Sequence, residues 1–89
     1  MDNREYNGWR NYATWNINLW LMNDNPLYDA LRKRVGGVRI DWYEAWILVG
    51  HVFDQFGMKE TPDGVSPDSL DVDWTQIASS INETFAEAA

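Results

Sequence analysis

The stretch YNGWRNYATWNINLWLMND, residues 6–24, decides the fold of this chain. It holds three of the six tryptophans and two of the four tyrosines in the sequence. Each aromatic side chain that becomes buried removes roughly 150–250 Å² from water, which is a strong driving force for folding. Since no other window is so dense in large apolar rings, we expect residues 6–24 to lie at the centre of a tryptophan-rich core.

The chain has 89 residues and no cysteine. This length is enough for one hydrophobic core, so we expect a single helical domain over residues 1–89. Without cysteine there is no disulfide framework, thiolate metal site or cysteine nucleophile. The polar N-terminus does not resemble a signal peptide, and the apolar run at residues 45–50 is far shorter than the ~20 residues that span a bilayer. We therefore predict a cytoplasmic protein that does not bind membranes.

Capping residues mark the first two predicted helices. Asn11 precedes residues 12–23, whose apolar side chains cover most of the helix circumference, as in a central buried helix. Asn25 is expected to cap a second helix that starts at Pro26, because proline is favoured at the first helical position. That helix should end at Gly36, since glycine readily adopts the left-handed backbone found at helix ends.

The third predicted helix has the clearest apolar period in the chain. Asp41 opens it, with Glu44 at the spacing of a capping box. Large apolar residues then recur every three or four positions until Gly57. The expected core stripe of this helix is Trp42, Ala45, Trp46, Val49, Val52, Phe53 and Phe56.

A long acidic loop, residues 57–72, separates the third helix from the fourth. Asp73 is the predicted cap of the fourth helix, with Gln76 as its capping-box partner. The apolar stripe of that helix is Trp74, Ile77, Ala78, Ile81, Phe85 and Ala88. The sequence thus predicts an all-α, four-helix bundle-like domain with a tryptophan-rich core and one acidic loop before the last helix.

The net charge of −7 lies entirely in the second half of the chain. Residues 1–44 hold six basic and six acidic side chains, whereas residues 45–89 hold Lys59 and eight acids. Such a field repels nucleic acid and membranes and attracts basic protein surfaces. We predict a host protein partner with a basic surface, bound through Asp54, Glu60, Asp63, Asp68, Asp71, Asp73, Glu83 and Glu87. The alternative is that Asp68 and Asp71 are solvated loop residues and Asp73 is only a helix cap.

Residues suited to catalysis or metal binding are few. His51 is the single histidine, and with Asp54 it supplies too few ligands for a metal site. The loop acids lack the spacing of a calcium-binding loop. The serines lack a nucleophile-elbow motif, and the glycines form no phosphate-binding loop. We expect no enzyme activity, no cofactor and no metal.

Residues 6–24 resemble a family of small proteins of bacteriophages, plasmids and other mobile elements, with the pattern Y-x-x-x-R-N-Y-x-T-W-N-V-x-L-W-L-x-N-D. The matching residues are Tyr6, Arg10, Asn11, Tyr12, Thr14, Trp15, Asn16, Leu19, Trp20, Leu21, Asn23 and Asp24, with Ile17 in place of Val. A second family block, TPDGV, is matched by residues 61–65. The resemblance implies a mobile-element accessory protein in the host cytoplasm, and it transfers no catalytic residue.

Four polar residues of the first block lie among rings that we expect to be buried: Arg10, Asn11, Thr14 and Asn16. Unpaired polar groups are costly in such surroundings. We interpret these residues as a hydrogen-bond network that joins the first block to the TPDGV turn. Stacking of Arg10 on an indole face is one alternative, and a surface recognition patch is another.

The acidic second half of the chain and the resemblance to mobile-element proteins together predict a non-enzymatic inhibitor of a host defence nucleoprotein complex, of anti-CRISPR or antirestriction type. It would occupy a basic surface that normally binds nucleic acid. One alternative is a structural or assembly module, either a homodimer or a phage accessory scaffold, with an apolar face left on the first or third helix. Single-stranded nucleic-acid binding through exposed tryptophans ranks last, because it needs a cationic groove. A compact domain whose charge only keeps it soluble is the simplest alternative.

Overall fold

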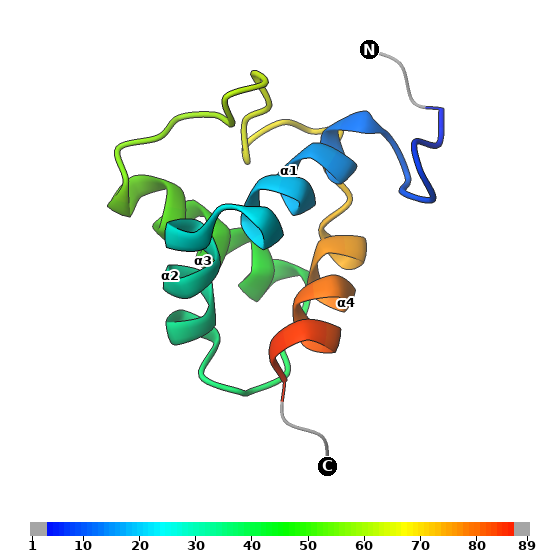
Figure 1. Ribbon diagram of the computed structural model, residues 1–89. Coiled ribbons are helices and arrows are strands. Elements are labelled where there is room, and N and C mark those ends of the chain that lie inside the picture. The colour runs from blue at the N-terminus through cyan, green and yellow to red at the C-terminus, as the bar shows by residue number, and fades with distance from the viewer. Residues whose placement is uncertain (1–3, 87–89) are drawn as a thin grey trace.

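The computed structural model describes residues 4–86, and the prediction of an all-α domain with four helices is confirmed in them (Figure 1). The radius of gyration, 12.1 Å, is close to the ~12 Å expected for a compact chain of this length. The helices are α1 (Tyr12–Asn23), α2 (Asn25–Val35), α3 (Trp42–Gln55) and α4 (Trp74–Phe85).

Three of the predicted caps are confirmed. The Asn11 side chain accepts a hydrogen bond from the backbone N–H of Thr14 at 2.9 Å and opens α1. Asp41 and Glu44 form a reciprocal capping box on α3, with side-chain to backbone distances of 2.8 and 3.1 Å. The Asp73 carboxylate accepts from the backbone N–H three residues on, at 3.1 Å, and opens α4. Each cap satisfies a backbone N–H that has no partner within its helix.

The start of α2 differs from the prediction by one residue. Its cap is Asp24, whose carboxylate accepts from the Leu27 N–H at 3.2 Å. Asn25 and Pro26 are therefore the first two helical residues. Proline is tolerated there because the N–H groups of the first turn have no intrahelical acceptor, and an aspartate at the cap also complements the positive end of the helix dipole. Gly36 ends the helix as expected, with a left-handed φ of 62°.

The core is mostly aliphatic, so the expectation of a tryptophan-rich core is wrong. Trp9, Trp20 and Trp74 pack against the edge of the core, and Trp42 and Trp46 remain 54% and 38% exposed. Helices that pack 8–10 Å apart leave spaces that Leu, Ile and Val fill, whereas an indole is wider and its N–H needs a partner. The largest fully buried apolar side chains are Phe53, Ile17, Leu21, Leu31, Ile77, Ile81, Val49 and Val52.

The predicted stripe of α3 divides into a buried and an exposed part. Ala45, Val49, Val52 and Phe53 are buried, because α3 packs against α2 and α4. The larger rings of the same stripe are exposed, and these are Trp42, Trp46 and Phe56. The exposed rings lie near the two ends of α3: Trp42 and Trp46 line one hollow with the loop and α4, and Phe56 lines another with α2.

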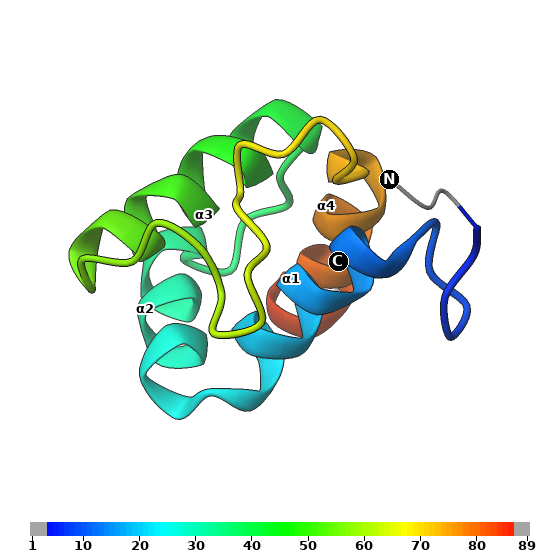
Figure 2. The ribbon, with the colours of Figure 1, turned by 90° about the horizontal axis from the view of Figure 1, so that it is seen from above.

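The loop between α3 and α4 runs back across the helices, beside α1 (Figure 2). Its residues Thr61, Val65, Pro67 and Val72 are buried, so the loop is packed onto the helices at several points along its length. It reaches the start of α4 close to the N-terminal half of α3 (Figure 2). This path determines which acidic side chains stay available to a partner.

Candidate functional site

Polar side chains of α1 hold the long loop in place, as the network interpretation predicts. The fully buried amide of Asn16 donates to the Asp63 carboxylate at 2.8 Å and accepts from the Thr61 hydroxyl at 2.6 Å. The indole N–H of Trp20 donates to the same Asp63 oxygen at 2.9 Å. Thr61 also accepts from the Val65 N–H at 3.1 Å, which closes the turn. The two sequence blocks are therefore joined directly.

A second set of contacts joins the start of α1 to the start of α4. The Asn11 amide donates to the backbone oxygen of Asp71 at 2.7 Å. The hydroxyl of Thr14 donates to Asn11 at 2.7 Å and accepts from the backbone N–H of Asp73 at 2.9 Å. Asn11 and Thr14 are both buried. These polar groups replace water contacts that burial has removed.

Arg10 enters the network through its backbone rather than its side chain. Its N–H donates to the side-chain oxygen of Gln76 at 2.8 Å. Gln76 is thus not the reciprocal capping-box partner that its spacing suggests, since the N–H of the Asp73 cap donates to Thr14 instead. The competing acceptor comes from a distant helix and has no signature in the local sequence.

The electrostatics of Asp63 reflect this structural role. The hydrogen bond from Asn16, and to a smaller extent that from Trp20, lowers the pKa of the Asp63 carboxyl, because both donors stabilise the charged form. The pKa of the nearby Tyr12 hydroxyl is raised, first by burial and then by the negative charge of Asp63. Asp63 is therefore an ionised anchor of the loop, with its donors supplied from within the chain.

The eight acids predicted to bind a partner have different environments. Asp63 and Asp73 are occupied by the network and by the α4 cap. Asp71 is half-buried and binds Asn11 through its backbone oxygen. Glu87 lies outside the described residues. Four acids are exposed, with carboxylates that make no hydrogen bond or ion pair to any part of the chain that the structure describes: Asp54, Glu60, Asp68 and Glu83.

These four acids do not share a single hollow. Asp54 and Asp68 line one hollow of about 490 Å³, together with Lys59. Glu83 lines a different one, of about 360 Å³, beside Trp9. The structure thus brings Asp54 and Asp68 together and separates them from Glu83, because the loop and α4 turn different faces to solvent.

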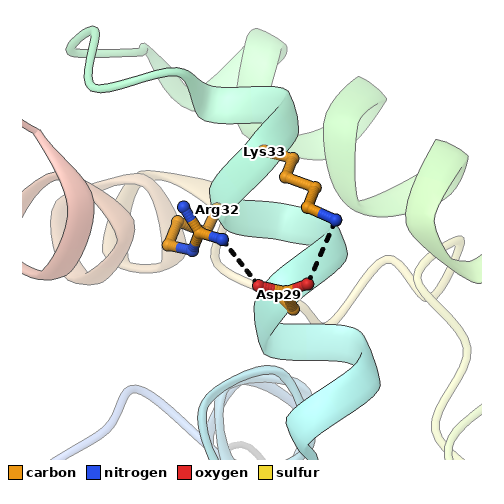
Figure 3. Close-up of polar contacts among 3 residues, drawn as sticks. All are labelled: Asp29, Arg32 and Lys33. Carbon is orange, nitrogen blue, oxygen red and sulfur yellow. Dashed lines mark hydrogen bonds and ion pairs between the residues drawn. The ribbon is translucent and has the colours of Figure 1, made fainter.

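The basic cluster at the end of α2 is partly neutralised (Figure 3). The Asp29 carboxylate binds Arg32 at 2.7 Å and Lys33 at 3.3 Å. The Arg32 hydrogen bond, followed by that of Lys33, lowers the pKa of Asp29. Arg34 donates to the Gln55 side chain at 3.1 Å. These internal contacts compete with any phosphate that approaches the cluster.

Sequence reasoning missed an apolar groove between the start of α3, the loop and the start of α4. Its volume is about 250 Å³. We call it the tryptophan groove, and its lining residues are Trp42, Trp46, Pro67, Asp68, Ser69, Leu70, Val72 and Trp74. The signal in the sequence was the unusually wide apolar stripe of the third helix, where Tyr43 adds a third large ring beside Trp42 and Trp46.

Asn82 is a second residue that sequence reasoning missed. Its buried side chain accepts from the N–H of Ile40 at 2.8 Å and donates to the carbonyl of Ile40 at 2.9 Å. One amide thus satisfies both backbone groups of a residue in the α2–α3 connection and fastens that connection to α4. A polar residue inside the apolar stripe of the fourth helix, next to Ile81, was the available signal.

Within residues 4–86, no group of three or more acidic or histidine side chains is placed to hold a metal ion. None of the helices in this range is long and apolar enough to cross a membrane. No curated protein and no solved structure matches the chain. A family of unknown function (DUF7249) matches residues 2–88. Because this match covers nearly the whole sequence, the chain belongs to that family of unknown function.

Proposed function

We propose that this chain is a non-enzymatic protein-binding module that occupies a basic, nucleic-acid-binding surface of a host nucleoprotein complex. The observation that supports it is the set of four exposed acids whose carboxylates bind nothing in the described residues: Asp54, Glu60, Asp68 and Glu83. Free carboxylates accept hydrogen bonds from Arg and Lys in the way that phosphates do. Resemblance to mobile-element proteins supports a defence complex as the target, with an anti-CRISPR or antirestriction outcome in the host cytoplasm.

The distribution of charge favours a protein target over nucleic acid. Lys59 is the one basic residue among residues 45–89, and it shares its hollow with Asp54 and Asp68. The basic cluster of α2 is engaged by Asp29 and Gln55. A phosphate backbone needs several uncompensated cations along its path, and the exposed acids would repel it.

Affinity capture from host lysate tests the proposal. The tagged chain should recover a nucleic-acid-binding complex at low salt and lose much of it at high salt, because exposed charges are screened. Recovery of membrane proteins alone, or of no nucleic-acid-binding protein, would contradict the proposal. The purified complex should then be displaced from its nucleic acid by this chain.

A charge variant refines the test. Neutralising the four free acids together, as D54N/E60Q/D68N/E83Q, should slow association with the captured complex at low salt and leave the rate at high salt nearly unchanged. The high-salt rate serves as the internal control for folding. Equal association rates at low salt would show that these acids do not guide binding.

The exposed aromatic face of α3 favours a second candidate, a helical homodimer or assembly module. Trp42, Tyr43 and Trp46 are all exposed there, and aromatic residues are enriched in protein interfaces. Light scattering over a wide concentration range tests this candidate. A rise in mass with concentration would support self-association, whereas a constant monomer mass would contradict it.

A further inference from the structure

The tryptophan groove is lined by three tryptophans and by one acidic residue, Asp68, which also borders the hollow that holds Lys59. The groove's lining residues come from the N-terminal half of α3, the loop and the start of α4, and Figure 2 shows that the loop reaches α4 beside this part of α3. We propose that this groove binds a lysine or arginine side chain from a basic segment of a protein partner. The inference rests on the proposed function for the existence of a basic partner, and it identifies the contact that would anchor it.

The size of the groove indicates a single side chain as its occupant. Its volume is about 250 Å³, below the roughly 300–1,000 Å³ of pockets that enclose drug-sized ligands. A long side chain with an apolar stem and a polar head fits such a space, because the stem covers apolar surface while the head meets a polar group. Leu70 and Pro67 supply the apolar wall, and Asp68 supplies the polar group.

The chemistry of the lining favours a cation. An ammonium or guanidinium group is attracted to an aromatic face, most strongly to that of tryptophan. All lining residues are neutral apart from Asp68, whose carboxylate is not engaged by any described residue. The carboxylates of Asp63 and Asp73, in contrast, already have donors within the chain. Asp68 is thus placed to pair with an incoming charge.

The same lining disfavours a nucleic acid as the occupant. Indoles stack on bases, but a nucleic acid also brings phosphates, which Asp68 would repel. The basic cluster that would have to compensate contacts the opposite end of α3, through Arg34 and Gln55. The distance along α3 from Trp42 to Gln55 is about 20 Å at the rise of an α-helix. The cations of that cluster therefore lie too far away to neutralise a phosphate at the groove. Arg39, three residues before Trp42, is a single cation, whereas a phosphate backbone needs several.

Tyr43 helps to hold the groove ready for binding. Its ring lies 5.6 Å from that of Trp42, at an interplanar angle of 78°, and 5.9 Å from that of Trp46, at 54°. Edge-to-face and tilted contacts of this kind are the favoured geometry of aromatic pairs. Rings that are ordered before binding lose less conformational entropy when a partner arrives.

NMR of the indole N–H groups tests the proposal with a model peptide in place of the partner. The probe is a blocked peptide of alternating arginine and leucine, compared with one in which glutamate replaces arginine. The six tryptophans provide six reporters. The arginine peptide should shift the signals of Trp42, Trp46 and Trp74 in a saturable manner, and those of Trp9 and Trp15 should stay in place.

Matched variants separate the carboxylate from the rings. Asp68→Asn should weaken arginine-peptide binding about two- to fivefold at low salt, the range of an exposed ion pair. Its fold should be intact, because no described contact depends on that carboxylate. Glu5→Gln makes the same charge change at an exposed acid outside the groove and outside the four free acids, and it should leave affinity unchanged. Trp46→Ala should weaken binding about five- to tenfold, with circular dichroism as the check on its fold.

Four outcomes would overturn the proposal. They are equal shifts with the glutamate peptide, equal shifts with a single-stranded oligonucleotide, shifts on raising protein concentration alone (a second copy as occupant), and no shift at the three groove tryptophans. If the groove tryptophans do not respond in this assay, the chain can still capture a nucleoprotein complex with a basic surface through its other free acids. The proposed function would then stand without this contact. Conversely, arginine-peptide binding at the groove stands even where lysate capture recovers no nucleoprotein complex, so the two failures can be told apart.

Discussion

Replacing Asn16 with leucine tests whether the polar network holds the loop on α1. Leucine is similar in size but removes both the donor to Asp63 and the acceptor for Thr61. Asn16 and Thr61 are both buried, at 0% and 2% exposure, so water does not readily replace the lost partner. The Thr61 hydroxyl would then be a buried donor with its acceptor removed.

The expected size of the effect follows from that orphaned hydroxyl. A buried polar group left without its partner costs about 1–3 kcal/mol. A domain of this size has about 4–13 kcal/mol of stability in total, so the loss is a substantial fraction. At ~4–8 °C per kcal/mol for small domains, the midpoint of thermal unfolding should fall by roughly 5–20 °C.

Two assays should report the change together. Urea unfolding, monitored by tryptophan fluorescence, measures the free energy of unfolding. Trypsin measures release of the loop, because Lys59 is its one cleavage site in residues 45–89, and cleavage there should become faster in Asn16→Leu than in the wild type.

Asn23→Leu is the matched control. Asn23 is exposed on the same helix and donates only to Leu19 within α1, so the change should stay within about 0.5 kcal/mol. If Asn16→Leu and Asn23→Leu give the same unfolding free energy and the same cleavage rate, the network does not anchor the loop.

Three further predictions concern other parts of the fold. Asn82→Ala removes both partners of the Ile40 backbone and should lower the free energy of unfolding in urea by about 2–4 kcal/mol. The control Ser79→Ala, at an exposed site of the same helix, should lower it by less than about 0.5 kcal/mol. Equal losses would exclude an anchoring role for Asn82. The pKa of Asp63 is lowered in the folded state, so its stabilising contribution is present above its unfolded pKa of about 4 and is lost as pH falls through the folded value. The stability difference between wild type and Asp63→Asn should therefore shrink on acidification below about pH 4, and a difference that grew there would refute the assignment. Gly36→Ala should destabilise the fold by about 1 kcal/mol, because the left-handed φ of 62° suits glycine. Gly50→Ala should instead stabilise the fold by about 0.5–1 kcal/mol, because this helical glycine has open space around it. Unfolding curves of the two glycine variants that shift in the same direction would contradict this interpretation of the backbone.

Features that depend on neighbouring residues were predictable. The caps at Asn11, Asp41 and Asp73 are confirmed, because a cap joins a side chain to a backbone N–H only a few positions away. The one-residue error at the start of α2 has the same local origin. Asp24 and Asn25 are both good capping residues, and the sequence contained no rule strong enough to choose between them.

Burial and the availability of acids depended on contacts between distant residues. Nothing near Asp63 in the sequence indicates that Asn16 and Trp20 would bind its carboxylate. Asp68 belongs to the same loop and is exposed, as expected. The tryptophan groove likewise joins residues of α3 to residues of the loop and of α4.

The sequence by itself determined the helices, the caps of three of them, the charge asymmetry and the presence of a polar network in the first block, since these follow from composition, period and short-range hydrogen bonds. Only the tertiary structure decided that aliphatic side chains fill the core and that tryptophans line its edge, because the spacing between packed helices selects side chains by shape as well as by hydrophobicity. The same packing brought the loop onto α1. It thereby divided the acids into structural anchors such as Asp63 and free carboxylates such as Asp68.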